Sequence, residues 1–172
     1  MLGDSRPYLF VTDDYGHSWR SISGDLPRDL FVRVVREDPV NRNLLYAGTQ
    51  RGVYASFDRG THWQSLRLNM PATAIYDLQI QPAMNDLIVA AHGRGVWILD
   101  DLRPLQQWNG SGASTAVLST PRDAYKMNHY APIQAFMGQP DNQFVGENAP
   151  AGTAITYYLA SAQRGVAIDI LD

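Results

Sequence analysis

TDDYGHSW, residues 12–19, returns as SFDRGTHW, residues 56–63. A hydroxyl residue, an aspartate, a glycine and a tryptophan stand at the same places in both octets, each displaced by 44 positions. A partial third copy follows, because GVY at 52–54 corresponds to GVW at 95–97 at a displacement of 43. A fixed period of about 40 to 50 residues is typical of propellers and repeat arrays.

Each period contains four short segments rich in β-branched and aromatic residues, and turn signals end them. In the third period the fourth segment, LRPLQQW, is less regular than the others. We therefore predict an all-β fold in which each period is a four-stranded antiparallel meander, the unit of a β-propeller blade. Any helix should be short. The clearest set of segments covers 32–37, 43–49, 53–57 and 62–68.

The octets have a physical logic of their own. The glycine can adopt a positive φ, and the aspartate two residues earlier can accept backbone N–H groups across the turn. Both tryptophans, Trp19 and Trp63, are predicted to be buried, with about 150 to 250 Å² of surface each. This reading assigns a structural role to Thr12, Asp14, Gly16, Ser18, Trp19, Ser56, Asp58, Gly60 and Trp63.

These octets resemble the Asp-box, Ser/Thr-x-Asp-x-Gly-x-Thr-Trp, of sialidase, xyloglucanase-type and sortilin-type propellers. The stretch 32–106 is similar to the closing blades of bacterial Asp-box (BNR-repeat) proteins described as sortilin-like or glycosyl-hydrolase-like, and the resemblance covers about residues 5–172. It implies a C-terminal fragment: the last blades of a propeller, then a linker and the start of a small β-sandwich. It also implies an extracytoplasmic location, secreted or periplasmic.

The octets depart from the Asp-box pattern in three places. Ser18 replaces the usual threonine and keeps its hydroxyl. In the second octet Thr61 and His62 precede the tryptophan, so the hydroxyl has slipped by one position and its hydrogen bond is left open. In the third period Asp101 persists, but Arg103 stands where glycine belongs. We expect that period to keep its strands and to have lost its box.

The periodicity also divides the chain. Residues 1–108 are predicted to be blades, and residues 109–150 a linker with an irregular segment. Within 151–172, the segments 154–161 and 166–172 are expected to form a hairpin. Three periods cannot close a ring of four to eight blades. The expected partners are therefore upstream blades of the same polypeptide.

Composition excludes several classes of function. The 172 residues carry a net charge of −3, which disfavours binding to nucleic acid. There is no cysteine and there are four histidines, so we expect no metal site and no cofactor. No apolar stretch approaches the roughly 18 to 20 residues of a membrane-spanning helix.

Four residues are candidate ligand contacts, because they occupy turns expected to open on the face opposite the octets. Arginine offers a planar fork of donors for carboxylate or phosphate, and histidine can donate or accept near neutral pH. The plainer alternative is that the arginines are solvated and the histidine bonds a neighbouring blade. The four residues are Gln50, Arg51, His92 and Arg94.

Catalytic residues are not visible in this chain. Asp14 and Asp58 belong to the turns, and Asp100 and Asp101 are adjacent along a strand, so their side chains point to opposite faces. Tyr157 and Tyr158 are better explained as sheet packing than as a sugar platform. Arg33 and Arg36 can line the central channel, but one of them should point into the junction between blades. The sequence favours a binding or scaffold module for peptide, protein or glycan. The alternative is part of a glycoside hydrolase, sialidase- or xyloglucanase-type, whose catalytic residues lie in missing blades.

Overall fold

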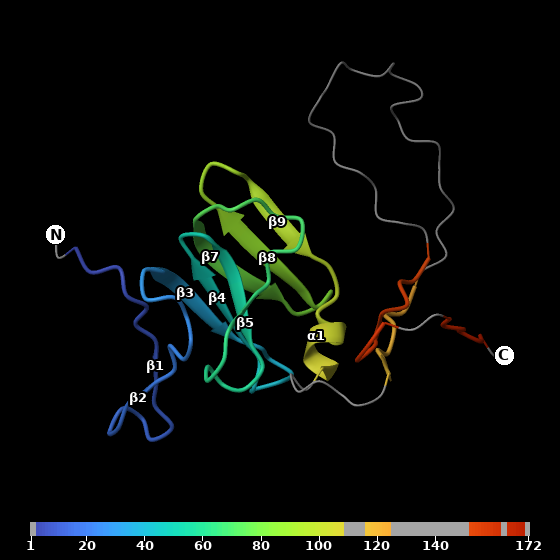
Figure 1. The fold of residues 1–172 in the computed structure, drawn as a ribbon, viewed down its shortest axis with the longest axis horizontal. Helices are drawn as coiled ribbons and strands as arrows, with labels where there is room; N and C mark the ends of the chain where they lie inside the picture. The colour runs from blue at the N-terminus through green and yellow to red at the C-terminus, as the bar shows by residue number, and fades with distance from the viewer. Residues whose placement is uncertain (1–2, 109–115, 125–151, 163–164, 171–172) are drawn as a thin grey trace, which may run out of the picture.

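The structure is a computed structural model that describes residues 3–108, 116–124, 152–162 and 165–170. These residues form small antiparallel sheets and a single helix of five residues, as Figure 1 shows. The prediction of an all-β fold is therefore confirmed.

Three antiparallel sheets follow one another along the first two thirds of the chain. The first is a ribbon of two strands, β1 (Phe10–Val11) and β2 (Arg20–Ser21). The second is a meander of four strands in the order β3-β4-β5-β6, and the third a meander of three in the order β7-β8-β9. Their bounds are β3 Val32–Glu37, β4 Leu45–Thr49, β5 Gly52–Ser56, β6 Gln64–Ser65, β7 Ile75–Gln81, β8 Asp86–Ala91 and β9 Val96–Leu99.

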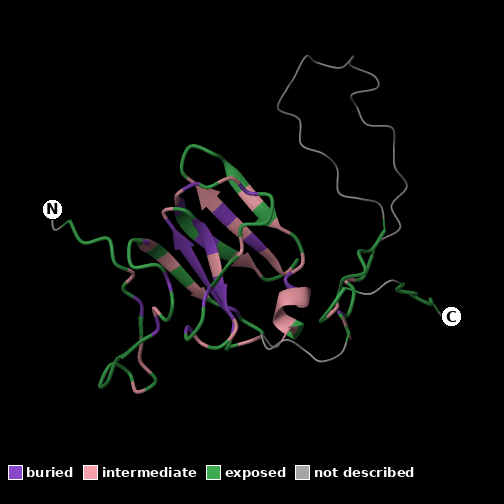
Figure 2. Ribbon diagram, viewed as in Figure 1, coloured by how far each residue is buried: buried purple, intermediate pink, exposed green. Residues whose placement is uncertain are grey.

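The four-stranded sheet supplies the centre of the core and is packed on both faces. One cluster of buried apolar side chains, including Leu44, Tyr46 and Val53, joins it to residues of β7 and β8. A second cluster, including Leu9, Ile22 and Trp63, joins it to the segments around β1 and β2. Figure 2 shows the buried residues concentrated in these middle strands. The three sheets therefore pack successively, face against face.

Equivalent positions of the three repeats show where this packing stops. Leu9, Val53 and Val96 occupy the same place in their repeats, and their exposed fractions are 7%, 1% and 65%. The first two are covered by the sheet that follows them in the chain. Val96, with its neighbour Ile98 (60% exposed), lies on a face that none of the described residues covers. The packing of successive sheets is thus open after the third sheet.

The third repeat departs from the expected four strands. Among the described residues no fourth strand pairs with β9, and helix α1 (Arg103–Gln107) follows it instead. Pro104 lies in the first helical turn, where its missing N–H costs nothing. Leu102 is fully buried, and Arg103 forms an ion pair with Asp101 at 2.6 Å. These contacts hold the segment in place without a strand partner.

The C-terminal part contains one further strand pair, between β10 (Val117–Leu118) and β11 (Tyr157–Tyr158). The sequence predicts that 154–161 pairs with 166–172. Within the described residues, β11, which lies inside 154–161, pairs with β10 instead. Trp108 connects the pair to the sheets, because its ring lies 4.4 Å from Phe57 and 5.9 Å from Tyr158. This contact agrees with a packing role for Tyr158. Most of the expected linker, 109–115 and 125–151, lies outside the described residues.

Candidate functional site

The first Asp-box is a closed set of hydrogen bonds around one carboxylate. The hydroxyl of Thr12 donates to Asp14 Oδ1 at 2.8 Å and accepts from the backbone N–H of Gly16 at 2.8 Å. The backbone N–H of Ser18 donates to Asp14 Oδ1 at 2.8 Å, and the Ser18 hydroxyl donates to Oδ2 at 2.6 Å. The hydrogen bonds from Ser18 lower the pKa of Asp14 to about 2. Both carboxylate oxygens therefore serve the turn.

The second Asp-box repeats this pattern with a different side chain. Ser56 and Gly60 take the places of the hydroxyl and the glycine at matching distances, and the His62 backbone N–H donates to Asp58 Oδ1 at 2.8 Å. The His62 ring Nδ1 lies 2.6 Å from Asp58 Oδ2, where the first box has a serine hydroxyl. Thr61 instead bonds the Asp58 carbonyl oxygen at 3.1 Å. The His62 imidazole thus takes the place that the Ser18 hydroxyl has in the first box, because the hydroxyl residue of the second box is one position earlier, at Thr61.

The contact between His62 and Asp58 shifts the pKa values of both side chains. The hydrogen bond with the Asp58 carboxylate raises the pKa of His62. Partial burial raises the pKa of Asp58, but the hydrogen bonds from the His62 backbone and ring outweigh it, so the pKa of Asp58 is lowered overall. The pair is therefore stabilised in its charged form.

The two box tryptophans have different surroundings. Trp63 is 8% exposed, its indole N–H donates to the Ile22 carbonyl at 2.9 Å, and its backbone N–H donates to Asp25 Oδ1 at 2.7 Å. Trp19 is 63% exposed. The prediction that both are buried is wrong for Trp19, because the surface that covers Trp63 belongs to the preceding repeat. None of the described residues takes that place for Trp19.

The predicted ligand turns lie at the other end of the sheets. Strand β5 begins at the turn with Gln50 and Arg51 and ends at Ser56, where the second box starts. The turn that contains His92 and Arg94 holds the same place between β8 and β9. We call this end, with the chain segments entering β3 and β7, the turn end.

Gln50 and Arg51 are held by the segment that enters β3. The Gln50 side-chain amide donates to the Asp29 carbonyl at 2.8 Å, and the Arg51 guanidinium pairs with the Asp29 carboxylate at 2.6 Å. This hydrogen bond from Arg51 lowers the pKa of Asp29. The Gln50 backbone N–H also donates to the Phe31 carbonyl at 3.1 Å. These two residues thus organise the loop before β3.

A column of aromatic and cationic side chains crosses from β3 to the β8–β9 turn. The Arg33 guanidinium lies 5.2 Å from the centre of the Phe31 ring and 4.5 Å from that of Tyr76. Tyr76 in turn stacks on His92, with ring centres 4.9 Å apart and an interplanar angle of 23°. Phe31 and Tyr76 are 40% and 52% exposed. We call Phe31, Arg33, Tyr76 and His92 the stacked column.

The stacked column carries a positive charge on Arg33, and the two flanking carboxylates, Asp29 and Asp77, are paired with other arginines. Within the described parts of the chain, Arg33 forms no ion pair, and neither does the exposed Arg94 in the adjoining turn. Arg36 differs, since it bonds the Leu78 carbonyl at 2.8 Å and the Asp77 carboxylate at 2.7 Å across the sheet junction. Of the two arginines assigned to the channel or the junction, Arg36 therefore lies at the junction and Arg33 at the column.

Sequence reasoning named His92 but missed Tyr76, its stacking partner. Phe31 was also missed, because it precedes its strand and looks like a loop residue. The sequence does contain a signal for Tyr76. Apolar and polar residues alternate along 78–81, but the aromatic Tyr76 and the charged Asp77 interrupt that alternation. The register of β7 shifts between Ile75 and Asp77, and at this irregularity Tyr76 is exposed whereas Ile75 is buried.

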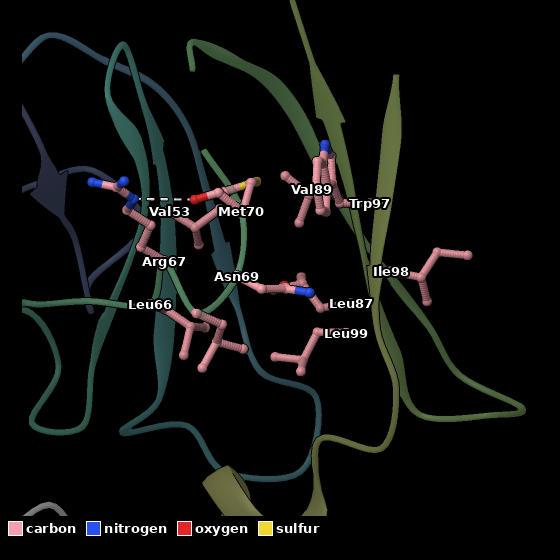
Figure 3. Close-up of a pocket in the computed structure, with 11 residues that line it drawn as sticks. Val53, Leu66, Arg67, Asn69, Met70, Leu87, Val89, Trp97, Ile98 and Leu99 are labelled. Atoms are coloured by element: carbon pink, nitrogen blue, oxygen red, sulfur yellow. Dashed lines mark hydrogen bonds between the residues drawn. The ribbon is translucent and has the colours of Figure 1, made fainter. Parts of the chain in front are cut away.

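A small groove of about 70 Å³ lies between the turn after β6 and strands β8 and β9, lined by Leu66, Met70, Val89 and Trp97 among others (Figure 3). In the described ranges, no cluster of three metal-ligating side chains occurs. No helix among those residues is long and apolar enough to cross a membrane.

Comparisons with protein-family models, with curated proteins and with solved structures gave no match.

Proposed function

We propose that this chain is part of an Asp-box β-propeller that acts as a binding or scaffold module, with its ligand site at the turn end. The observation that carries the proposal is the stacked column. The candidate ligands are a glycan, a peptide or a protein segment that bears an acidic group. Further repeats of the same polypeptide, upstream of the first box, are the proposed partners in the fold.

The chemistry of the column favours such a ligand. A guanidinium that stacks on aromatic rings keeps its N–H edge free for a carboxylate or phosphate. Tyr76 is 52% exposed although Arg33 and His92 both lie against its ring, so the rim of the ring offers apolar surface beside that edge. An acidic group on the arginine and a ring or aliphatic chain on the tyrosine would be recognised together.

Hydrolysis is the less favoured function for this surface. A glycoside hydrolase needs two carboxyl groups about 5 to 9.5 Å apart that face one bond. Asp29 and Asp77, which flank the column, each form an ion pair with an arginine. Asp14 and Asp58 serve the boxes at the other end. Binding is therefore the better supported proposal.

The test is a screen of this chain against arrays of acidic and neutral oligosaccharides and of acidic and neutral peptides. We expect acidic ligands to bind, and Arg33→Gln to weaken binding about tenfold or more, which corresponds to about 1.4 kcal/mol. Tyr76→Ala should also weaken it. The matched control is Arg42→Gln, because Arg42 is another exposed arginine, paired with Glu37 at the far end of β3. Equal binding by the Arg33 and Arg42 variants would contradict the proposal.

A further inference from the structure

The two Asp-boxes share their backbone geometry, and their tryptophans differ in what covers them. The residues before the glycines, Tyr15 and Arg59, have φ of 57° and 58°, and Gly16 and Gly60 have φ of 93° and 86°. In both boxes the hydroxyl residue, the glycine N–H and the N–H of the residue before the tryptophan make the same hydrogen bonds. Yet Tyr15 and Trp19 are fully and largely exposed, whereas the tryptophan of the second box is buried.

The surface that covers the second box is the turn after β2, residues 22–25. Trp63 bonds the Ile22 carbonyl and the Asp25 carboxylate with its indole and backbone N–H groups. The contact is close on both sides. A Cβ on Gly60 would lie 2.6 Å from that of Ile22, and a Cβ on Gly24 would overlap the Thr61 carbonyl oxygen. Glycine is therefore required on both the box and the turn.

The corresponding turn of the next repeat shows what happens when no box is present. Leu66 and Met70 make the same backbone hydrogen bonds as Ile22 and Leu26, and the residues at the third position have nearly equal φ, 47° at Gly24 and 46° at Leu68. Leu68 is 68% exposed. A side chain is tolerated here because the third repeat has lost its box.

We propose that the first box is an interaction surface for one kind of partner: a turn of the Ile22–Asp25 type, presented by a preceding repeat of the same polypeptide. This inference rests on the repeat architecture of the proposed function. The turn would present an apolar residue with a free carbonyl, a glycine of positive φ two positions later, and then Asp or Asn. Trp19 would donate its indole N–H to that carbonyl, and Gly16 would contact the apolar residue.

A second copy of this chain does not offer such a turn. Its own residues 22–25 are already covered by its second box. Its turn after β6 carries Leu68 at the position where docking requires glycine. Of the described turns, therefore, neither the one after β2 nor the one after β6 can cover the first Asp-box of another copy of the chain.

The test is a tandem duplication of residues 8–51, which adds one 44-residue repeat and keeps the rest of the chain intact. The second of the two Trp19 copies then faces an added Ile22–Asp25 turn, while the first copy stays bare. Labelling with 5-fluorotryptophan gives one ¹⁹F resonance per tryptophan, assigned by Trp→Phe substitutions. A soluble gadolinium chelate broadens exposed resonances. We expect the second Trp19 to lose its broadening and match Trp63, and the first to stay broadened.

The control is Gly24→Leu in the added turn alone, which copies Leu68. This substitution should preserve the backbone of the turn and prevent docking, so the chelate should again broaden the ¹⁹F resonance of the second Trp19 fully. Broadening of both Trp19 copies in the unsubstituted duplication, with Trp63 protected, would overturn the inference. So would protection of Trp19 that rises with protein concentration in the original chain, because it would assign the surface to a second copy.

A measurement on the original chain keeps the inference testable if the duplication does not fold. A cyclic peptide that carries residues 21–28 should narrow the broadened Trp19 resonance, and the same peptide with Leu in place of Gly24 should not. No change up to the solubility limit of the peptide would overturn the inference. Ligand binding at the turn end is scored separately with Arg33→Gln, so failure of one proposal leaves the other intact.

Discussion

At the scale of single residues, the two boxes show that one geometry is reached with different chemistry. The Ser18 hydroxyl and the His62 imidazole occupy the same place beside their aspartates, both at 2.6 Å. A serine bonds its aspartate at any pH at which the carboxylate is charged. The imidazole contact changes when the ring loses its proton, so only the second box is sensitive to neutral pH.

The pH dependence has a definite sign. Because the pKa of His62 is raised in the folded chain above its ordinary 6.5, the pair contributes stability below pH 6.5 and loses it as pH rises through the raised pKa. The effect is small, since both side chains are substantially exposed. In urea denaturation, the midpoint concentration should therefore be lower at a pH above the raised pKa of His62 than at pH 6. His62→Ser should flatten this difference, and an unchanged pH profile would contradict the assignment.

The tryptophans give a matched pair of substitutions. Trp63→Ala should destabilise the chain by about 3 to 5 kcal/mol, because it empties a buried site and leaves the Ile22 carbonyl without its donor. Trp19→Ala should change stability by no more than about 0.5 kcal/mol, since its ring is largely exposed. Equilibrium urea unfolding measures both. Equal losses in the two variants would show that Trp19 is buried in solution.

At the scale of elements, helix α1 depends on contacts that are distant in sequence. Its Gln106 side-chain amide donates to both oxygens of Asp38, at 3.2 and 3.0 Å, and to Asn85 at 2.9 Å. Asp38 is 1% exposed and also accepts from the Tyr46 hydroxyl at 3.0 Å. A buried carboxylate needs every such donor. The helix therefore closes the polar end of the central sheet.

Removal of this amide tests the role of the helix. Gln106→Ala should cost about 1 to 3 kcal/mol, because Asp38 stays buried with one donor fewer. The control is Gln107→Ala on the same helix. The Gln107 side-chain oxygen accepts from Ser119 and Thr120, and its loss should change stability by about 0.5 kcal/mol or less. Thermal unfolding followed by circular dichroism compares them. A larger loss for Gln107 would contradict the account.

At the scale of the whole molecule, successive sheets pack through faces that repeat every 43 or 44 residues, and two such faces are left uncovered by the residues that the structure describes. One carries Phe10 and Trp19, and the other carries Val96 and Ile98, each more than half exposed. Exposed apolar surface of this kind marks an interaction site or a tendency to associate. The bare faces are thus the expected consequence of an open array.

Much of this fold could be predicted from the sequence, because strands and boxes are local. The predicted segment 32–37 matches β3, and 53–57 differs from β5 by one residue at each end. Contacts between repeats could not be predicted in the same way. The contact of Arg33 with Tyr76 and the packing of the helix through Gln106 on Asp38 each join two repeats, and the exposure of Trp19 depends on whether a preceding repeat covers it.

The most direct test of the central claim, that the turn end binds the ligand, is a map of amide chemical shifts as the strongest array ligand is added. The account predicts shifts at residues 29–33, 50–51, 74–76 and 92–95, and none in the boxes at 12–19 and 56–63. Arg33→Gln should suppress these shifts. Shifts that cluster at the boxes, with the turn end unchanged, would contradict it.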